Sequence, residues 1–200
     1  GKIVVDEISP KDKFGKVFTN ETQFHSQSVG KSLASYILGH AICKGYIESI
    51  DAQINDWPLI ENSIYHNQKI IDLINMAAGD QAYFSKDNPS NRYKKTGRSV
   101  SNTTIKKAME NEFKEIIKSK RKYAYNNFPP PLIMNYIIFK IGEEKYQELL
   151  DDIFRKKVGI EHGMYFVEPE TSEPGDRSTH STFLATRYDY LRMSKAMLDD

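Results

Sequence analysis

The stretch Ser26-Gln27-Ser28-Val29-Gly30-Lys31-Ser32-Leu33-Ala34-Ser35, residues 26–35, begins a segment with a clear helical pattern. From Ser28 to Lys44 the apolar residues recur mostly at three or four positions, which predicts a helix, and Gly45 follows as a candidate C-cap. Small residues are frequent along this segment, so neighbouring elements can approach it closely. The pattern predicts a helix buried on several sides, as a central helix would be.

Ser28 and Lys31 form a Ser-x-x-Lys pair at the start of this helix. Residues three apart lie on one helix face, so the lysine amine can come within hydrogen-bond reach of the serine hydroxyl. Burial would lower the pKa of that amine and allow the neutral form to accept the hydroxyl proton. The helix N-terminus adds free N–H groups that can face a developing oxyanion.

The four-residue pattern has little weight by itself, because 16 Ser and 21 Lys in 200 residues give about two matches by chance. Two are present, Ser28 with Lys31 and Ser119 with Lys122. The second ends a highly charged run and is expected to be solvated, whereas the first opens a buried helix. A structural ion pair remains the alternative for Lys31.

A second polar motif is Tyr125-Asn126-Asn127, in a short segment between two predicted helices. Loops often present functional side chains. Tyr125 could relay a proton between Lys31 and a leaving group, and Asn127 could hold a substrate carbonyl. The alternative is a capping Asn beside a core Tyr.

The remaining pattern predicts two short strands followed by several helices and no repeats. Residues 80–97 are expected to be a loop, and residues 160–185 to be irregular or extended. A second set of strands that could pair with the first is not evident, and two strands alone would be marginal. The expected strands cover residues 2–7 and 16–19, and the expected helices cover residues 68–78, 101–119, 132–141, 143–157 and 186–198.

Composition excludes several classes of protein. The chain is 39% hydrophobic with a net charge of +1, so no global field favours nucleic acid. The apolar stretches are too short to span a bilayer. The single cysteine, Cys43, excludes an internal disulfide and a multi-cysteine zinc site, and it is expected to be a small core residue. No metal or cofactor is expected, and the compartment, bacterial periplasm or cytoplasm, is left open.

Four segments in this order resemble the beta-lactamase-related serine hydrolases. This group contains class C beta-lactamases, D-alanyl-D-alanine carboxypeptidases, esterases and 6-aminohexanoate-oligomer hydrolases. The resemblance rests on residues 26–35 with 45–51, on Asp72-Leu73-Ile74-Asn75-Met76-Ala77-Ala78-Gly79, on Tyr125-Asn126-Asn127, and on Ala185-Thr186-Arg187-Tyr188-Asp189-Tyr190.

The resemblance implies an α+β fold of the beta-lactamase and transpeptidase type, an antiparallel sheet beside a helical subdomain. Residues 1–200 would be one partial domain, with sheet strands in 1–27, the active-site helix and helical subdomain in 28–200, and the C-terminal strands absent. The family's Lys/His-Ser/Thr-Gly strand should follow the helix at Thr186. Lys95-Thr96-Gly97 spells this element, but it precedes Tyr125 and lies in a polar loop, so we expect it to be unrelated.

The resemblance also implies roles. Ser28 would be acylated, Lys31 would be the general base, Tyr125 would assist proton transfer, and Asn127 would contact the substrate. The expected activity is hydrolysis of an amide or ester, with a short oligomeric one as first choice because of the long loop after Asp80. A non-catalytic penicillin-binding or sensor-like relative and a plain helical interaction domain are the alternatives.

Overall fold

The computed structural model describes residues 2–117, 119–162, 165–166, 176 and 183–200. Its central element is helix α1, Val29–Cys43, which buries Leu33, Ala34, Ile37, Leu38 and Ala41 against its neighbours. The sequence prediction for this helix is confirmed. Cys43, however, lies at the exposed end of α1, so its assignment to the core was wrong.

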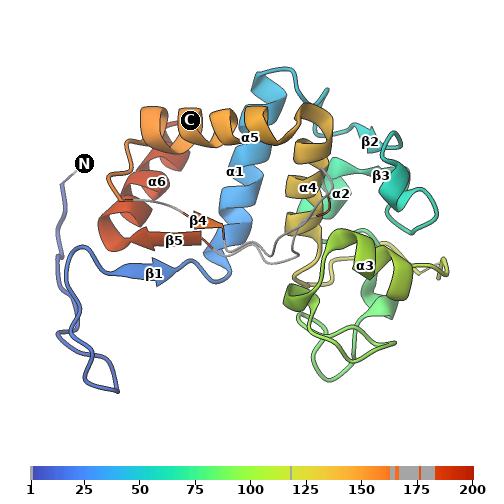
Figure 1. The fold of residues 1–200 in the computed structure, drawn as a ribbon, viewed down its shortest axis with the longest axis horizontal. Coiled ribbons are helices and arrows are strands. Elements are labelled where there is room, and N and C mark those ends of the chain that lie inside the picture. Colours follow the sequence, from blue (N-terminus) through green and yellow to red (C-terminus); the bar gives the residue numbers. More distant parts are fainter. Residues whose placement is uncertain (1, 118, 163–164, 167–175, 177–182) are drawn as a thin grey trace.

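A three-stranded antiparallel sheet lies beside the start of α1 (Figure 1), in the order β1 (Gln23–His25), β5 (Phe183–Thr186) and β4 (Tyr165–Phe166). Gln23 pairs with Thr186, and Tyr165 pairs with Leu184. The strands expected at residues 2–7 and 16–19 are not formed. Val4 and Val5 are 90% and 76% exposed, and only an isolated bridge joins Lys11 to Val17.

The helices enclose α1 from one side and from its far end. Helix α4 (Pro129–Ile141) packs along α1, and α5 (Glu143–Leu150) packs against both. Helix α5 continues into the π-helix η4 (Asp151–Val158), where Gly159 at φ 73° ends it, and α6 (Arg187–Asp199) lies beside β5 and η4. The predicted helices 132–141, 143–157 and 186–198 are therefore confirmed.

Two predicted helices are much shorter than expected. Helix α2 covers only Ile70–Ile74, preceded by a small hairpin of β2 (Gln53–Ile54) and β3 (Gln68–Lys69). Helix α3 covers Ile105–Asn111, where Thr104 caps it by accepting from the Lys107 N–H. The short turns η1 (Pro58–Ile60), η2 (Gln81–Tyr83) and η3 (Val100–Asn102) fill the connections. Between residues 160 and 185, the structure describes β4 and the start of β5, and residues 163–164, 167–175 and 177–182 lie outside the described part.

The lobe formed by residues 80–125 has its own aromatic centre. The Phe113 ring lies 4.8–6.2 Å from five other rings, those of Tyr65, Tyr83, Phe84, Tyr93 and Phe128. Edge-to-face and tilted pairs of this kind stabilise beyond the apolar area that they bury. The loop expected at residues 80–97 is thus an irregular segment whose aromatic rings pack around Phe113, two residues after the end of α3.

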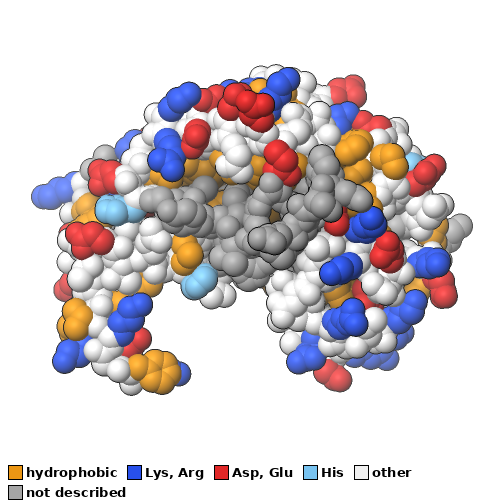
Figure 2. Space-filling model, in the orientation of Figure 1, with side chains coloured by type: hydrophobic (Ala, Val, Ile, Leu, Met, Phe, Trp, Pro, Cys, Tyr) orange, Lys and Arg blue, Asp and Glu red, His pale blue; other side chains and the backbone are white. Residues whose placement is uncertain are grey.

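This lobe is also the most cationic part of the chain, with twelve Lys and Arg against five Asp and Glu. Lys and Arg side chains gather over it in the space-filling view (Figure 2). Because the whole chain has a net charge of only +1, the rest of the chain carries an excess of acidic residues. Among the described residues, the helices are all too short or too polar to cross a bilayer.

Candidate functional site

Ser28 sits at the junction between the sheet and α1. Ser26 fixes the end of β1: its N–H donates to the Phe183 carbonyl at 2.8 Å, and its hydroxyl accepts from the Phe183 N–H at 3.0 Å. Gln27 follows with φ 49°, a left-handed conformation that is uncommon for a residue with a side chain. This turn reverses the chain and places Ser28 at the N-cap position of α1.

The hydroxyl and the backbone N–H of Ser28 take no part in the hydrogen bonds of the helix. Its side chain makes no capping hydrogen bond, and its N–H has no hydrogen-bond partner among the described residues. A free N–H at a helix N-terminus lies in the positive field of the helix dipole. Both groups are therefore available for chemistry at the exposed end of α1.

Tyr125, which is 97 residues away in the sequence, reaches this hydroxyl. The Tyr125 OH lies 2.7 Å from Ser28 Oγ, and the Lys31 Nζ lies 4.8 Å from the centroid of the Tyr125 ring. The structure thus brings together three of the four predicted site residues. The direct partner of Ser28 is Tyr125, and Lys31 acts on the tyrosine.

The pKa of Tyr125 is lowered from its ordinary value. Partial burial raises the pKa, but hydrogen bonds from Lys31 and Ser28 and the positive charge of Lys31 outweigh it. All three favour the phenolate, since a nearby cation and donors stabilise the charged form of an acid. At a given pH, a larger fraction of Tyr125 is therefore in the phenolate form, the form that can accept a proton, than of an isolated tyrosine.

Backbone hydrogen bonds fix the segment that carries Tyr125. The Ala124 N–H donates to the Met76 carbonyl at 2.8 Å, and the Asn127 N–H donates to the Ser90 carbonyl at 3.0 Å. Met76 adopts φ 50° to turn its carbonyl toward this segment. The predicted helix through residues 68–78 fails for this reason, because the chain leaves helical geometry after Ile74 to bind residue 124.

The two asparagines of the motif have different surroundings. Asn126 is 1% exposed, and its side-chain amide donates to both carboxylate oxygens of Asp80 at 3.3 Å. Asn127 is half-buried, and its side chain makes no hydrogen bond within the described part of the chain. Asn127 is therefore the asparagine that is free to meet a ligand, whereas Asn126 is structural.

Two hollows adjoin the site. One of about 180 Å³ is lined by Lys31, Ser35, Met76 and Ile133 among others. The other, about 440 Å³ and mostly apolar, is lined by residues of β1, α1 and α6, His25 and Val29 among them. Ser28 lines neither, but its neighbours Val29 and Lys31 each line one of them.

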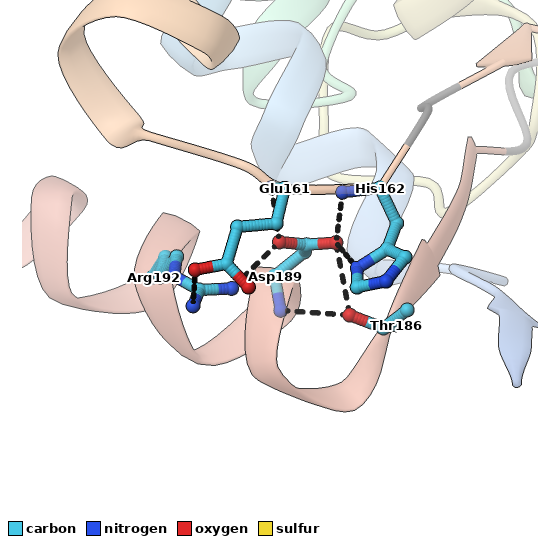
Figure 3. A network of polar contacts seen from close by, with 5 residues as sticks. All are labelled: Glu161, His162, Thr186, Asp189 and Arg192. Atoms are coloured by element: carbon cyan, nitrogen blue, oxygen red, sulfur yellow. Dashed lines mark hydrogen bonds and ion pairs between the residues drawn. The ribbon is translucent and has the colours of Figure 1, made fainter. Parts of the chain in front are cut away.

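The start of α6 contains a separate polar network (Figure 3). The fully buried Asp189 accepts hydrogen bonds from the N–H groups of Glu161 and His162, from the Thr186 hydroxyl and from Arg192. Burial raises the pKa of Asp189, but these donors outweigh it, so the pKa lies below its ordinary value. This network joins the segment after η4 to α6 and β5, and it contains no atom of the Ser28 site.

Other candidate groups do not assemble into sites in the described residues. No three His, Cys, Asp or Glu side chains lie close enough together there to hold a metal ion. Lys95-Thr96-Gly97 is a turn with Gly97 at φ 68°, and the Thr96 hydroxyl donates to Glu112 at 2.5 Å. It is not a strand, in agreement with the sequence prediction.

The fold and this arrangement of residues can be compared with known proteins. No family model matches the chain, and no curated protein matches it. Among solved structures, a class C beta lactamase from Rhodobacter sphaeroides superposes with a TM-score of 0.62 at 14% sequence identity. The match covers 92% of this chain and 54% of that one. The chain has the beta-lactamase fold.

The beta-lactamase fold predicted from the four sequence segments is thus confirmed, with mixed helices and small antiparallel sheets. The chain spans about half the length of the similar enzyme. The finer branches that the sequence suggested, esterase and amide-oligomer hydrolase, gain no support from this likeness. Sequence reasoning also missed Asp80, which lies outside the motifs, and the backbone roles of Gln27 and Met76, which lie within the segments at residues 26–35 and 72–79.

Proposed function

We propose that the protein is a serine hydrolase that cleaves an amide or ester through an acyl-enzyme on Ser28. One observation carries this proposal, the 2.7 Å contact between Ser28 Oγ and the Tyr125 OH with Lys31 at the tyrosine ring. A nucleophile needs an adjacent base that a third group orients or activates, and these three residues have that arrangement.

In the first half-reaction, the Ser28 Oγ–H bond breaks as Oγ bonds to the substrate carbonyl carbon. The proton passes to the Tyr125 oxygen, whose phenolate form the Lys31 charge stabilises. The carbonyl oxygen becomes an oxyanion that the free Ser28 N–H can bind. Collapse of the tetrahedral intermediate breaks the bond to the amine or alcohol, which takes the proton from Tyr125.

In the second half-reaction, Tyr125 accepts a proton from water as the water oxygen attacks the acyl carbon. The Ser28 Oγ–carbon bond then breaks, Tyr125 returns the proton to Oγ, and a carboxylic acid leaves. Lys31, predicted from the sequence to be the base itself, acts here through its charge on Tyr125. Asn127 would contact the substrate carbonyl or amide, and a short oligomeric amide or ester remains our preferred substrate.

The test uses the full-length protein. A fluorophosphonate probe is expected to label wild type at Ser28, located by peptide mass, and not to label Ser28→Ala. Ser119→Ala is the matched control, because Ser119 belongs to the second Ser-x-x-Lys pair and should not matter. Labelling at a different residue, or none, would contradict the proposal.

Turnover separates a hydrolase from the sensor-like alternative. A hydrolase should release p-nitrophenol from a p-nitrophenyl ester continuously, and Tyr125→Phe should lower kcat/KM about 10²-fold or more. A single burst equal to the enzyme concentration, followed by no release, would favour an acylated sensor instead.

A further inference from the structure

Asp80 is a buried carboxylate that the chemistry above does not use. Its side chain is fully buried, and it accepts a hydrogen bond from the Tyr65 OH at 2.8 Å. Burial raises the pKa of Asp80 above its ordinary value, with the hydrogen bonds from Tyr65 and Asn126 acting against it. An acid placed where its charged form is disfavoured must have a compensating contact.

That contact is Asn126, the residue directly after Tyr125. The Asn126 amide NH₂ donates to Asp80 and, at 3.2 Å, to the Ala124 carbonyl, and its Oδ1 accepts from the Phe128 N–H at 3.0 Å. Every polar atom of this side chain is therefore used to hold residues 124–128 in one conformation. Asp80 fixes which way the amide points, because only an acceptor can face the NH₂ group.

We propose that Asp80 and Asn126 are positioning residues that set the Tyr125 hydroxyl against Ser28 and Lys31. The carboxylate anchors the amide, the amide anchors the backbone on both sides of Tyr125, and the tyrosine ring can then reach α1. This inference rests on the proposed function for its catalytic consequence. Its geometric content, the placement of Tyr125 beside Lys31, stands independently of any reaction.

The test exchanges the two side chains. Asp80→Asn replaces one of the two oxygens that face the Asn126 NH₂ with an NH₂ group, so Tyr65 and Asn126 must share the oxygen that remains, and a flip of Asn126 would leave the Phe128 N–H facing a donor. The double variant Asp80→Asn with Asn126→Asp restores a donor opposite an acceptor and keeps an acceptor for Phe128, but it loses the hydrogen bond to the Ala124 carbonyl. Tyr65→Phe is the control, since it removes a hydrogen bond from the same carboxylate without touching Asn126.

Two readouts are measured on each variant. The first is the pKa of Tyr125, from ultraviolet titration against the Tyr125→Phe background, which requires no catalysis. The second is the rate constant for acylation of Ser28 and its pH profile. In Asp80→Asn the Tyr125 pKa should rise toward its ordinary value of about 10, and acylation should slow by about 10²-fold, as for a catalytic group displaced by about 1 Å. The exchanged double variant should recover a measurable part of both, and Tyr65→Phe should change neither.

An unchanged Tyr125 pKa in Asp80→Asn, or equal effects in Asp80→Asn and Tyr65→Phe, would overturn the proposal. If Asp80→Asn does not fold, Asn126→Ser gives the same decision, because it loses the contact to Asp80 and leaves the carboxylate and Tyr65 in place. A Tyr125 pKa and an acylation rate constant equal to those of wild type in Asn126→Ser would also overturn the proposal. If wild type is never acylated at Ser28, the proposed function fails, while the pKa readout still decides the positioning role.

Discussion

At the scale of single residues, the site depends on a backbone conformation that its own residue does not favour. Gln27 takes φ 49° directly before Ser28. The left-handed region costs a residue with a Cβ roughly 1–2 kcal/mol. Strained residues persist where the surrounding structure determines them, and here the strand end and the helix start leave no other path.

Replacing Gln27 tests this strain. Gln27→Gly is expected to be more stable than Gln27→Ala by about 0.5–1 kcal/mol, because glycine adopts positive φ freely but loses more chain entropy on folding. Chemical denaturation of both variants gives the difference. Equal stabilities, or a less stable glycine variant, would show that the turn is not strained.

The charge of Lys31 gives a second prediction at this scale. Lys31→Met should raise the pKa of Tyr125, since the lysine hydrogen bond and charge lower it. If the phenolate is the base, activity rises with pH through the Tyr125 pKa, so this rise should move to higher pH in the variant. Lys122→Met, in the other Ser-x-x-Lys pair, is the matched control. A pH profile that moves equally in both variants would argue against a specific role for Lys31.

At the scale of elements, the Asp189 network joins three segments at the start of α6. Asp189→Asn removes the charge that organises four donors and should lower the free energy of unfolding by about 2 kcal/mol at neutral pH. The pKa of Asp189 is lowered in the folded state, so its contribution is complete above the unfolded value of about 3.9. It is lost as the pH falls below that value through the folded pKa.

Unfolding measured from pH 7 to pH 3 checks this sign. The difference in the free energy of unfolding between wild type and Asp189→Asn should be constant down to about pH 5 and should shrink below about pH 4. Asp199→Asn provides the control, because Asp199 is an exposed carboxylate of the same helix that pairs with Lys195. Surface pairs contribute little, so this variant should behave as wild type. A difference that grows at acid pH would contradict the assignment.

Elements also show what could be predicted from the sequence. Helix α1 is long and keeps one apolar period, so its existence followed from the pattern. Strand β1 has three residues, too few for an alternation to be seen, and its partner β5 lies about 160 residues further along. The apolar run at Lys2–Asp6 has the β-propensity of a strand, but propensity does not reveal whether a partner strand lies beside it.

The site could be predicted only where its residues belong to sequence motifs with a recognisable chemistry. Ser28, Lys31 and Tyr125 belong to short patterns whose order along the chain suggested their meeting, and two of them meet at 2.7 Å. Asp80 belongs to no pattern, and Met76 belongs to the segment at residues 72–79, whose resemblance carries no role for it. The role of Asp80 depends on burial and on an amide 46 residues later, and that of Met76 on one carbonyl, both of which arise only from the tertiary fold.

At the scale of the whole molecule, the beta-lactamase fold places Ser28 and Tyr125 on different parts of the chain. Ser28 is the N-cap of the central helix α1, which lies beside the sheet (Figure 1), and Tyr125 ends the cationic lobe formed by residues 80–125. The hydroxyl contact therefore forms only when the lobe is docked on α1 and α4. Activity should be lost wherever that docking is lost, even if α1 itself remains folded.

The uneven distribution of charge has a kinetic consequence. Lys120 and Lys122 are exposed and lie just before Tyr125 in the sequence, so a negatively charged ester would be guided toward the reacting hydroxyl by a long-range field. Such guidance weakens when salt shortens the screening length to about 8 Å at physiological ionic strength. The rate at which enzyme and ester meet, rather than the rate of the bond-making step, would then depend on the salt concentration of the buffer.

Varying the ionic strength separates substrate encounter from the bond-making step. For p-nitrophenyl succinate, kcat/KM should fall several-fold between about 0.01 and 0.15 M salt, while the uncharged p-nitrophenyl butyrate should show little change. Lys120→Gln combined with Lys122→Gln should reduce the salt dependence for the succinate and leave kcat for the butyrate unaltered. Identical salt profiles for the two esters would mean that the lobe has no part in capture. A decline confined to the anionic ester would mean that a protein with a net charge near zero nevertheless recruits its substrate by local attraction.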